Sequence, residues 1–185
     1  MRMLHIAPEA MFFAKFRNNN DIEYHPIDKS PENYPEGTRQ MDLTDLQYEA
    51  NSFDGIICSH VLEHIPDDKK AMEELFRVLK PGGWAALQVP LDEKRGQTYE
   101  DWSITTPEER EKAFGQWDHV RVYGRDFGDR LRGVGFVVTV ESSEREFGGD
   151  ERFRFGLGKE SIFSCEKKPT PQRKPKPFLD VFIFL

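Results

Sequence analysis

A chain of 185 residues is long enough for one domain with a full hydrophobic core and too short for two domains of ordinary size. Hydrophobic residues make up 37% of it and charged residues 32%, which excludes a disordered chain and favours a globular protein with a polar surface. The net charge of -7 argues against a nucleic-acid groove as the main surface, so we expect no nucleic-acid partner.

The first half of the chain alternates short apolar strands with a helical pattern. The predicted elements are a strand over residues 3–7, a helix over 11–16, a strand over 22–27, a short third element before Asp42, and a strand over 53–58. The run from Phe53 to Cys58 is continuously apolar, which is typical of a strand buried on both faces in a parallel sheet.

A helix should follow this buried strand. Asp67 and Asp68 open it, because acidic residues in the first turn suit the positive end of a helix. Its apolar stripe consists of Ala71, Met72, Leu75, Phe76 and Leu79. We expect residues 81–83, Pro-Gly-Gly, to end the helix and residues 84–89 to form the next strand.

The rest of the chain contains two more helices and two more strands. Thr106, Pro107 and Glu109 form a capping box that begins a helix, and Gly115 ends it. The further predicted elements are a helix over 125–132 and strands over 136–140 and 161–165, which should pair as an antiparallel hairpin. This order predicts an α/β fold with a doubly wound, mostly parallel sheet of seven strands and a terminal antiparallel hairpin.

Composition divides the chain into residues 1–168, which we expect to form the domain, and residues 169–185, a Pro/Lys-rich linker with an apolar tail. The tail, residues 178–185, is too short to span a bilayer. It could add a strand to a sheet edge, which would allow a homodimer, or it could pack loosely.

The two cysteines and the N-terminal sequence bear on the cellular compartment in which we expect the protein. Cys58 and Cys165 are far apart in apolar runs and form no metal-ligand cluster, so a reduced, cytoplasmic protein is the simplest interpretation. Arg2 and His5 interrupt the N-terminal apolar run, so we expect no signal peptide. No run approaches the roughly 20 apolar residues of a membrane span, and we expect no membrane partner.

The block over residues 51–89 carries a family resemblance. It reads N-S-F-D-G-I-I-C-S-H-V-L-E-H-I-P-D-D, then a helical segment, then R-V-L-K-P-G-G-W-A-A-L-Q-V. This block resembles the central part of class I S-adenosylmethionine (SAM) methyltransferases. The resemblance extends over roughly residues 3 to 166 and implies a Rossmann-like fold, SAM as cofactor and a methyl-transferring enzyme.

The glycine-rich loop that usually follows the first strand of that family is missing. Leu4-His5-Ile6-Ala7-Pro8-Glu9 stands in its place. This A-P-E variant resembles a methyltransferase type 11-like subgroup, whose members also carry segments similar to Glu100-Asp101 and to residues 115–124, G-Q-W-D-H-V-R-V-Y-G.

Cofactor residues should follow the strands, because ligands of open α/β sheets bind beyond the strands' carboxyl ends. Ala7 is the smallest substitute for glycine that keeps a β-carbon, Pro8 fixes the turn, and Glu9 could accept hydrogen bonds from the cofactor's ammonium group. Alternatively, this segment is a surface turn. Asp28 follows the second strand and could take both ribose hydroxyls, the alternative being an ordinary turn aspartate.

The resemblance implies further cofactor contacts. Asp42 would contact the adenine amino group and Leu43 would offer its backbone N–H to the ring, unless Asp42 is simply a loop aspartate. Ser59 and His60 would lie beside the methionine part of the cofactor.

The histidines of the same block also permit a zinc site. His60, Glu63 and His64 are close in sequence, but the zinc motif requires H-E-x-x-H and here Glu63 directly precedes the second histidine. We therefore predict no metal, and a structural hydrogen-bonding role for His64.

The segment over residues 115–124 is the best candidate for acceptor chemistry, because it concentrates side-chain donors and acceptors. His119, oriented by Asp118, could act as the base that an oxygen nucleophile needs. Arg121 could hold a carboxylate or phosphate of the acceptor, with Gln116 and Tyr123 nearby. The alternative is a polar network that pins a loop to the sheet.

These observations predict a SAM-dependent methyltransferase acting on an unidentified small-molecule acceptor. The main alternative is a non-catalytic binding or scaffold protein with the same fold, favoured by the missing glycines and by a chain that starts inside the fold, without the N-terminal helices that usually cover the cofactor. A nicotinamide oxidoreductase requires G-x-G-x-x-G after a first strand, and that motif is absent.

Overall fold

The computed structural model of the chain describes residues 1–142 and 161–169. Its main sheet has seven strands in the order β3-β2-β1-β4-β5-β9-β8. The strands are β1 (Arg2–Ile6), β2 (Glu23–Asp28), β3 (Arg39–Gln40), β4 (Phe53–Ser59), β5 (Leu79–Gln88), β8 (Val137–Ser142) and β9 (Ser161–Glu166). Strands β3, β2, β1, β4 and β5 are parallel neighbours, and β9 is antiparallel to both β5 and β8. The predicted doubly wound sheet and its terminal hairpin are confirmed.

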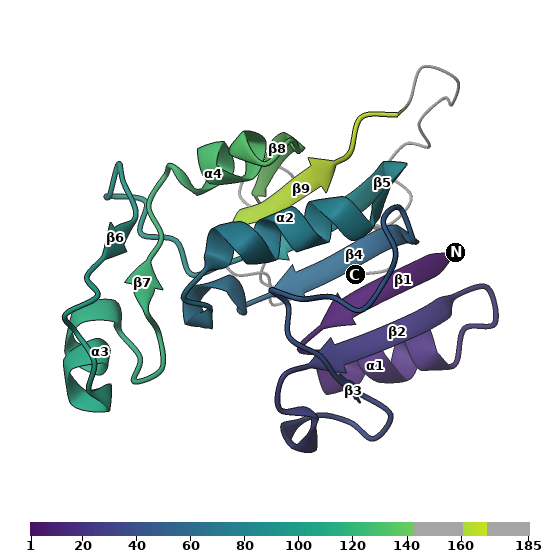
Figure 1. Cartoon of the computed structure of the whole chain (residues 1–185), viewed down its shortest axis with the longest axis horizontal. Helices are drawn as coiled ribbons and strands as arrows, with labels where there is room; N and C mark the ends of the chain where they lie inside the picture. The colour runs from purple at the N-terminus through teal and green to yellow at the C-terminus, as the bar shows by residue number, and fades with distance from the viewer. Residues whose placement is uncertain (143–160, 170–185) are drawn as a thin grey trace, which may run out of the picture.

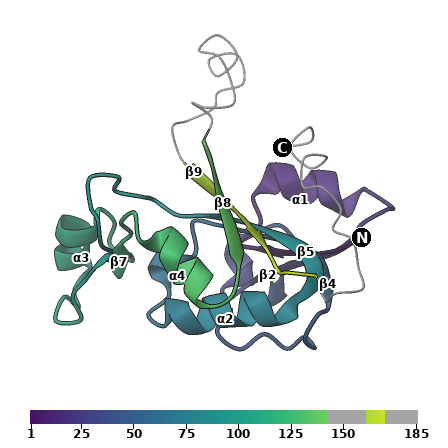
Figure 2. The same ribbon diagram turned by 90° about the horizontal axis from the view of Figure 1, so that it is seen from above.

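Helices cover both faces of this sheet. The helices are α1 (Ala10–Arg17), α2 (Asp68–Val78), α3 (Pro107–Phe114) and α4 (Phe127–Gly133), with short 3-10 helices η1 (Pro31–Asn33) and η2 (Leu62–His64). Seen from above, α1 lies on one face and α2 and α4 lie on the other (Figure 2). None of the described helices is long and apolar enough to span a bilayer.

The core forms where the predicted apolar runs meet. Phe53, Ile56 and Cys58 of β4 have no exposed surface, as expected for a strand covered on both faces. Helix α2 buries Ala71, Met72, Leu75 and Val78 against the sheet, and the Asp67 side chain caps it by accepting from the backbone N–H of Lys70.

The boundary between α2 and β5 differs from the prediction. The helix ends at Val78, and β5 begins at Leu79 instead of Trp84. Leu79 pairs with Phe53 and Trp84 with Gly55, so the register shifts between these two pairs. The intervening residues include Gly83, where an added β-carbon would lie 3.0 Å from the backbone oxygen of Asp54. The Pro-Gly-Gly sequence is therefore an irregularity within the strand and not a turn before it.

A small lobe lies beyond the carboxyl ends of β1, β2 and β4 (Figure 1). It contains α3 and an antiparallel pair that was not predicted, β6 (Tyr99–Glu100) and β7 (Arg121–Val122). The predicted capping box of α3 is confirmed, with Thr106 and Glu109 bonding each other's backbone, and Gly115 ends the helix at φ +89°. The linker prediction beyond Pro169, including the apolar tail over residues 178–185, lies outside the described residues.

Candidate functional site

A cavity of about 580 Å³ opens at the carboxyl ends of β1, β2 and β4. This volume is within the usual range for small-molecule sites, and its place is where open α/β sheets bind ligands. Five of the eight residues predicted to bind a cofactor line it, namely Ala7, Asp28, Asp42, Leu43 and His60. The topology therefore brings together residues that come from four separate loops.

Two lining residues have a backbone conformation that favours glycine. Ala7 has φ +52° and His60 has φ +53°. Among the described residues, Asn51 is the third non-glycine residue with positive φ. This conformation strains a residue with a β-carbon, and such strain tends to cluster at ligand sites. The first loop has thus kept the backbone geometry of a glycine turn although alanine occupies it.

Asp28 closes β2 and presents its carboxylate to the cavity. Its Oδ1 accepts from the backbone N–H of Ser30 at 2.7 Å, and its side chain is also hydrogen-bonded to Tyr34. Burial raises the pKa of Asp28, an effect that these hydrogen bonds partly oppose. Each carboxylate oxygen has two lone pairs, so Asp28 retains acceptor capacity for a ligand.

Asp42 stands in the loop after β3. Its Oδ1 accepts from both the backbone N–H and the hydroxyl of Thr44, at 2.9 and 2.7 Å, and its Oδ2 lies 2.9 Å from Nζ of Lys29. These Thr44 bonds and the Lys29 ammonium lower the pKa of Asp42 to about 2. Asp42 is therefore a fixed negative charge at the cavity, next to the buried, apolar Leu43.

The other three predicted cofactor residues are not among those that line the cavity. Pro8 is buried. The Glu9 carboxylate lies 2.9 Å from Nε2 of the fully buried His5, whose Nδ1 contacts the Tyr24 hydroxyl at 2.7 Å. Ser59 Oγ donates to Oε1 of Gln88 at 3.2 Å.

The structure turns Arg121 and Tyr123 inward, away from any acceptor. Arg121 is 1% exposed and donates to the backbone oxygens of Leu62, Ile65 and Pro66 and to the Glu100 carboxylate. The predicted contact between Arg121 and an acceptor is therefore unsupported, because its donors are taken up by η2, the loop after it and β6.

Tyr123 belongs to the same buried network. Its hydroxyl donates to Oδ2 of Asp68 at 2.7 Å, and Arg130 bridges Oδ1 of Asp68 and Oε1 of Glu100 at 2.8 and 3.0 Å. Tyr123 has no exposed surface, so it does not meet an acceptor either. For these two residues, the alternative of a polar network that pins a loop to the sheet describes the structure.

His119 and Asp118 lie near the cavity but not as a catalytic pair. Asp118 lines the cavity together with His64, whereas His119 is 8% exposed and is not among the lining residues. Oδ2 of Asp118 contacts Nδ1 of His64 at 3.2 Å, and Oδ1 accepts from Nε2 of Gln116 at 2.8 Å. Burial and the neighbouring His64 lower the pKa of His119. Asp118 thus orients His64 and not His119, contrary to our prediction.

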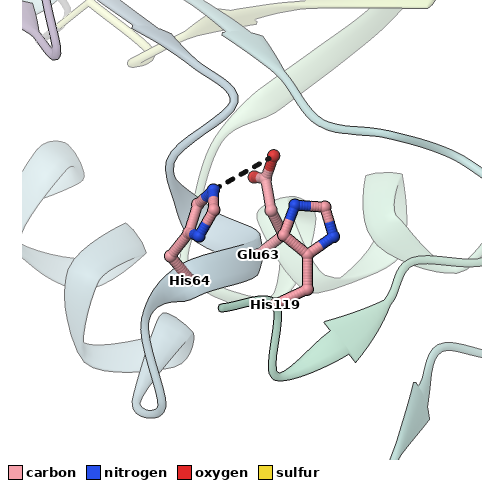
Figure 3. Close-up of side chains that lie close together, drawn as sticks. All are labelled: Glu63, His64 and His119. Carbon is pink, nitrogen blue, oxygen red and sulfur yellow. Dashed lines mark ion pairs between the residues drawn. The ribbon is translucent and has the colours of Figure 1, made fainter. Parts of the chain in front are cut away.

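Glu63 is the site residue whose environment the sequence did not reveal. It is 1% exposed, yet neither carboxylate oxygen has a hydrogen-bond partner among the described residues. Figure 3 shows its carboxylate between the rings of His64 and His119, whose centroids are 4.7 Å apart. Glu63, His60 and His64 are close together in the sequence. His119 is far from them in the sequence, and the fold brings it next to Glu63 and His64.

Segments of this chain are similar in sequence to known proteins. Residues 8–87 match the family model described as a methyltransferase domain. A demethylmenaquinone methyltransferase of Clavibacter sepedonicus is 45% identical over 42 residues, which cover 23% of this chain and 17% of that protein. The ubiquinone/menaquinone biosynthesis C-methyltransferase UbiE of Brucella canis is 34% identical over 71 residues, which cover 35% of this chain and 25% of that protein. The matches thus span at most a quarter of either relative's length.

Solved structures resemble nearly the whole chain. The cyclase SpnF superposes with a TM-score of 0.63 and 15% identity, covering 91% of this chain and 76% of that chain. Phosphoethanolamine N-methyltransferase 2 of Haemonchus contortus, in complex with S-adenosyl-L-methionine, gives a TM-score of 0.55 at 17% identity over 91% of this chain and 49% of that chain. At such identities the likeness shows the fold and not the reaction. Residues 8–87 of the chain are therefore similar to a methyltransferase domain, and the fold of the chain is like that of these solved structures.

Proposed function

We propose that this protein is a SAM-dependent methyltransferase acting on a small-molecule acceptor. The observation that carries the proposal is the cavity itself, which lies at the carboxyl ends of the central parallel strands and is lined by Asp28, Asp42, Leu43 and the Ala7 turn. The methyltransferase family match over residues 8–87 supports the same reaction.

The lining residues fit SAM. Asp28 offers carboxylate acceptors at the end of β2, which suits the two hydroxyls of a ribose. Leu43 offers an apolar surface to the adenine ring, and the negative charge of Asp42 suits the amino group of that ring. The positive φ of Ala7 keeps the first loop in the turn that a glycine would adopt. Bound SAM would supply a methyl group on a sulfonium.

The protein's own contribution to such a reaction is positional. Methyl transfer is an in-line displacement, so most of the catalysis comes from holding the nucleophile close to the methyl group. We infer that the acceptor would enter at the side lined by His64 and Asp118, whose polar groups are not among the proposed SAM contacts. The relatives named above are quinone-biosynthesis methyltransferases, which favours a small molecule as acceptor, and the net charge of -7 disfavours a nucleic acid.

Calorimetric titration with S-adenosylhomocysteine, the demethylated product, tests the proposal. We expect binding in the micromolar range. Asp28→Ala should weaken it by at least about 10-fold, since a hydrogen bond to a charged group contributes roughly 1.5–3 kcal/mol. Asp21→Ala is the matched control, because Asp21 is exposed and does not line the cavity. Absence of binding to the folded protein up to millimolar concentration would overturn the proposal.

A further inference from the structure

The carboxylate of Glu63 is buried without a hydrogen bond from the residues that the structure describes. Its side chain is 2% exposed, and neither oxygen accepts a hydrogen bond from the described residues. The nearest nitrogens that are measured, Nδ1 of His60 and Nε2 of His64, lie 3.6 and 4.0 Å from Oε1, which is beyond hydrogen-bond length. A buried carboxylate is normally paired, hydrogen-bonded or bound to a metal.

Two histidines complete a metal-ligand set around this carboxylate. One ligand atom from each of Glu63, His64 and His119 lies within 4.8 Å of the other two. In Figure 3 the two imidazole rings lie on either side of the carboxylate. Two imidazoles and one carboxylate are a common set for Zn²⁺ and for other divalent first-row metals, whereas Mg²⁺ and Ca²⁺ prefer oxygen ligands.

Both histidines are oriented in the way that metal ligands usually are. Nδ1 of His64 contacts Oδ2 of Asp118 at 3.2 Å, so the other ring nitrogen, Nε2, is the one that faces Glu63. The ring of His119 is hydrogen-bonded to the backbone of Phe114. A ligand histidine typically donates its second ring N–H to a carboxylate or a backbone carbonyl, which fixes the ring and its tautomer.

The fold holds the two contributing segments together firmly. The backbone N–H of Val120 donates to the backbone oxygen of Glu63 at 3.0 Å. Next to it, the buried Arg121 donates to the backbone oxygen of Leu62 at 2.9 Å. These bonds join η2, which carries Glu63 and His64, to the segment that carries His119. The triad is thus part of a rigid junction and not a chance approach of mobile side chains.

We propose that Glu63, His64 and His119 bind one divalent transition-metal ion of the zinc type. Tetrahedral zinc places neighbouring ligand atoms ~3.4 Å apart, given metal–ligand distances of roughly 2.0–2.2 Å. The ligand atoms here lie within 4.8 Å of one another, and Oε1 of Glu63 is 4.0 Å from Nε2 of His64, so metal binding requires the side chains to move closer together by rotation. Because His64 also lines the cavity, the fourth coordination position would face the acceptor end.

The role of this ion rests on the proposed function, although the binding itself does not. An acceptor oxygen or sulfur that took the fourth position would become more acidic beside the cation and would be fixed near the methyl donor. The metal would then do what we expected His119 to do as a base, and His119 would act as a ligand.

Titration calorimetry with Zn²⁺ on the EDTA-dialysed, untagged full-length protein tests the binding. We expect one Zn²⁺ per chain. Glu63→Gln should weaken binding by more than the roughly 10- to 100-fold typical of losing an outer partner of a metal ligand. Glu23→Gln is the matched control, because the exposed Glu23 also contacts a histidine, His25, at 2.8 Å but belongs to no such triad among the described residues. Equal affinity of wild type and Glu63→Gln would overturn the proposal, as would absence of Zn²⁺ binding by the wild type.

Thermal unfolding separates a binding defect from a folding defect. Without metal, Glu63→Gln should unfold at the same or a higher temperature than wild type, because a buried carboxylate that has no hydrogen-bond partner among the described residues is gone. Zn²⁺ should raise the unfolding temperature of wild type and not that of the variant. A rise of equal size in both would contradict the site. No SAM or S-adenosylhomocysteine is present in either measurement, so these results stand apart from those of the cofactor titration.

Discussion

The carboxylate of Asp118 positions His64 through a contact of 3.2 Å between Oδ2 and Nδ1. His119 follows Asp118 directly in the chain, yet its ring stands at 81° to that of His64, with the ring centroids 4.7 Å apart. The two residues that the sequence suggested as a base and its orienting acid thus form one cluster with His64, in which the acid contacts His64 and not His119. This relationship sets the orientation of His64, which lines the cavity together with Asp118.

Asp118→Asn should weaken Zn²⁺ binding by roughly 10- to 100-fold, since the amide no longer supplies the negative charge that holds the ring of His64. Calorimetric titration on the metal-free protein measures the change. Asp101→Asn, which alters an exposed turn aspartate bonded to Ser103, is the control and should leave the affinity as it is. An unchanged affinity in Asp118→Asn would show that Asp118 does not support a metal ligand.

Ala7→Gly should raise the free energy of unfolding by about 1 kcal/mol or less, because glycine adopts φ +52° without the strain that a β-carbon brings. Urea unfolding measures the difference. Ala14→Gly is the control with the opposite sign, since Ala14 is an exposed residue inside α1 and glycine there costs about 1 kcal/mol. If both variants lose stability equally, the first loop does not need a glycine-like turn.

Arg121→Ala should lower the free energy of unfolding by about 3–5 kcal/mol, because it removes a buried guanidinium that donates to three backbone oxygens and leaves Arg130 as the remaining arginine on the Glu100 carboxylate. The free energy of unfolding of Arg121→Lys should lie between those of Arg121→Ala and wild type, since a single ammonium cannot replace the planar fork of donors. Arg95→Ala is the control. Arg95 pairs with Asp92 at the surface, where such a pair contributes about 1 kcal/mol or less. An Arg121→Ala protein as stable as wild type would return Arg121 to the list of acceptor ligands.

Asp42 should contribute stability that depends on pH. Its pKa is lowered from an ordinary value of 3.8 to about 2 by the Thr44 bonds and Lys29. A carboxyl with a lowered folded-state pKa stabilises the protein above its unfolded pKa and loses that contribution as pH falls through the folded value. The stability difference between wild type and Asp42→Asn should therefore be larger at pH 6 than at pH 3, as measured by urea unfolding. An equal stability difference at pH 6 and at pH 3 would contradict a lowered pKa of Asp42. The control is Asp45→Asn, which changes another aspartate of the same loop.

Much of the main sheet could be predicted because strands such as β4 are largely apolar and are followed by polar residues. The run from Phe53 to Cys58 and the capping box at Thr106 were both unambiguous, and the structure confirms them. Strands β6 and β7 were missed because each has two residues, too few for any periodicity. The start of β5 was misplaced because the Pro-Gly-Gly sequence looks like a helix stop, whereas Leu79 already pairs with Phe53.

The cavity could be predicted in part because strand ends converge by topology. Ala7, Asp28 and His60 line it for the reason that the sequence suggested, their place just after parallel strands. The direction of individual side chains could not be predicted. Arg121 resembles an anion ligand in the sequence, but only the fold shows that it donates to carbonyl groups of η2 and of the loop after it. The approach of His119 to Glu63 is likewise a long-range contact that no spacing rule contains.

A crystal structure of the protein grown with S-adenosylhomocysteine tests the central claim most directly. Our account predicts the ligand in the cavity, with both ribose hydroxyls within hydrogen-bond distance of the Asp28 carboxylate and the adenine ring against Leu43. Ligand density elsewhere on the chain, with the cavity free of it, would contradict the assignment of this cavity as the SAM site.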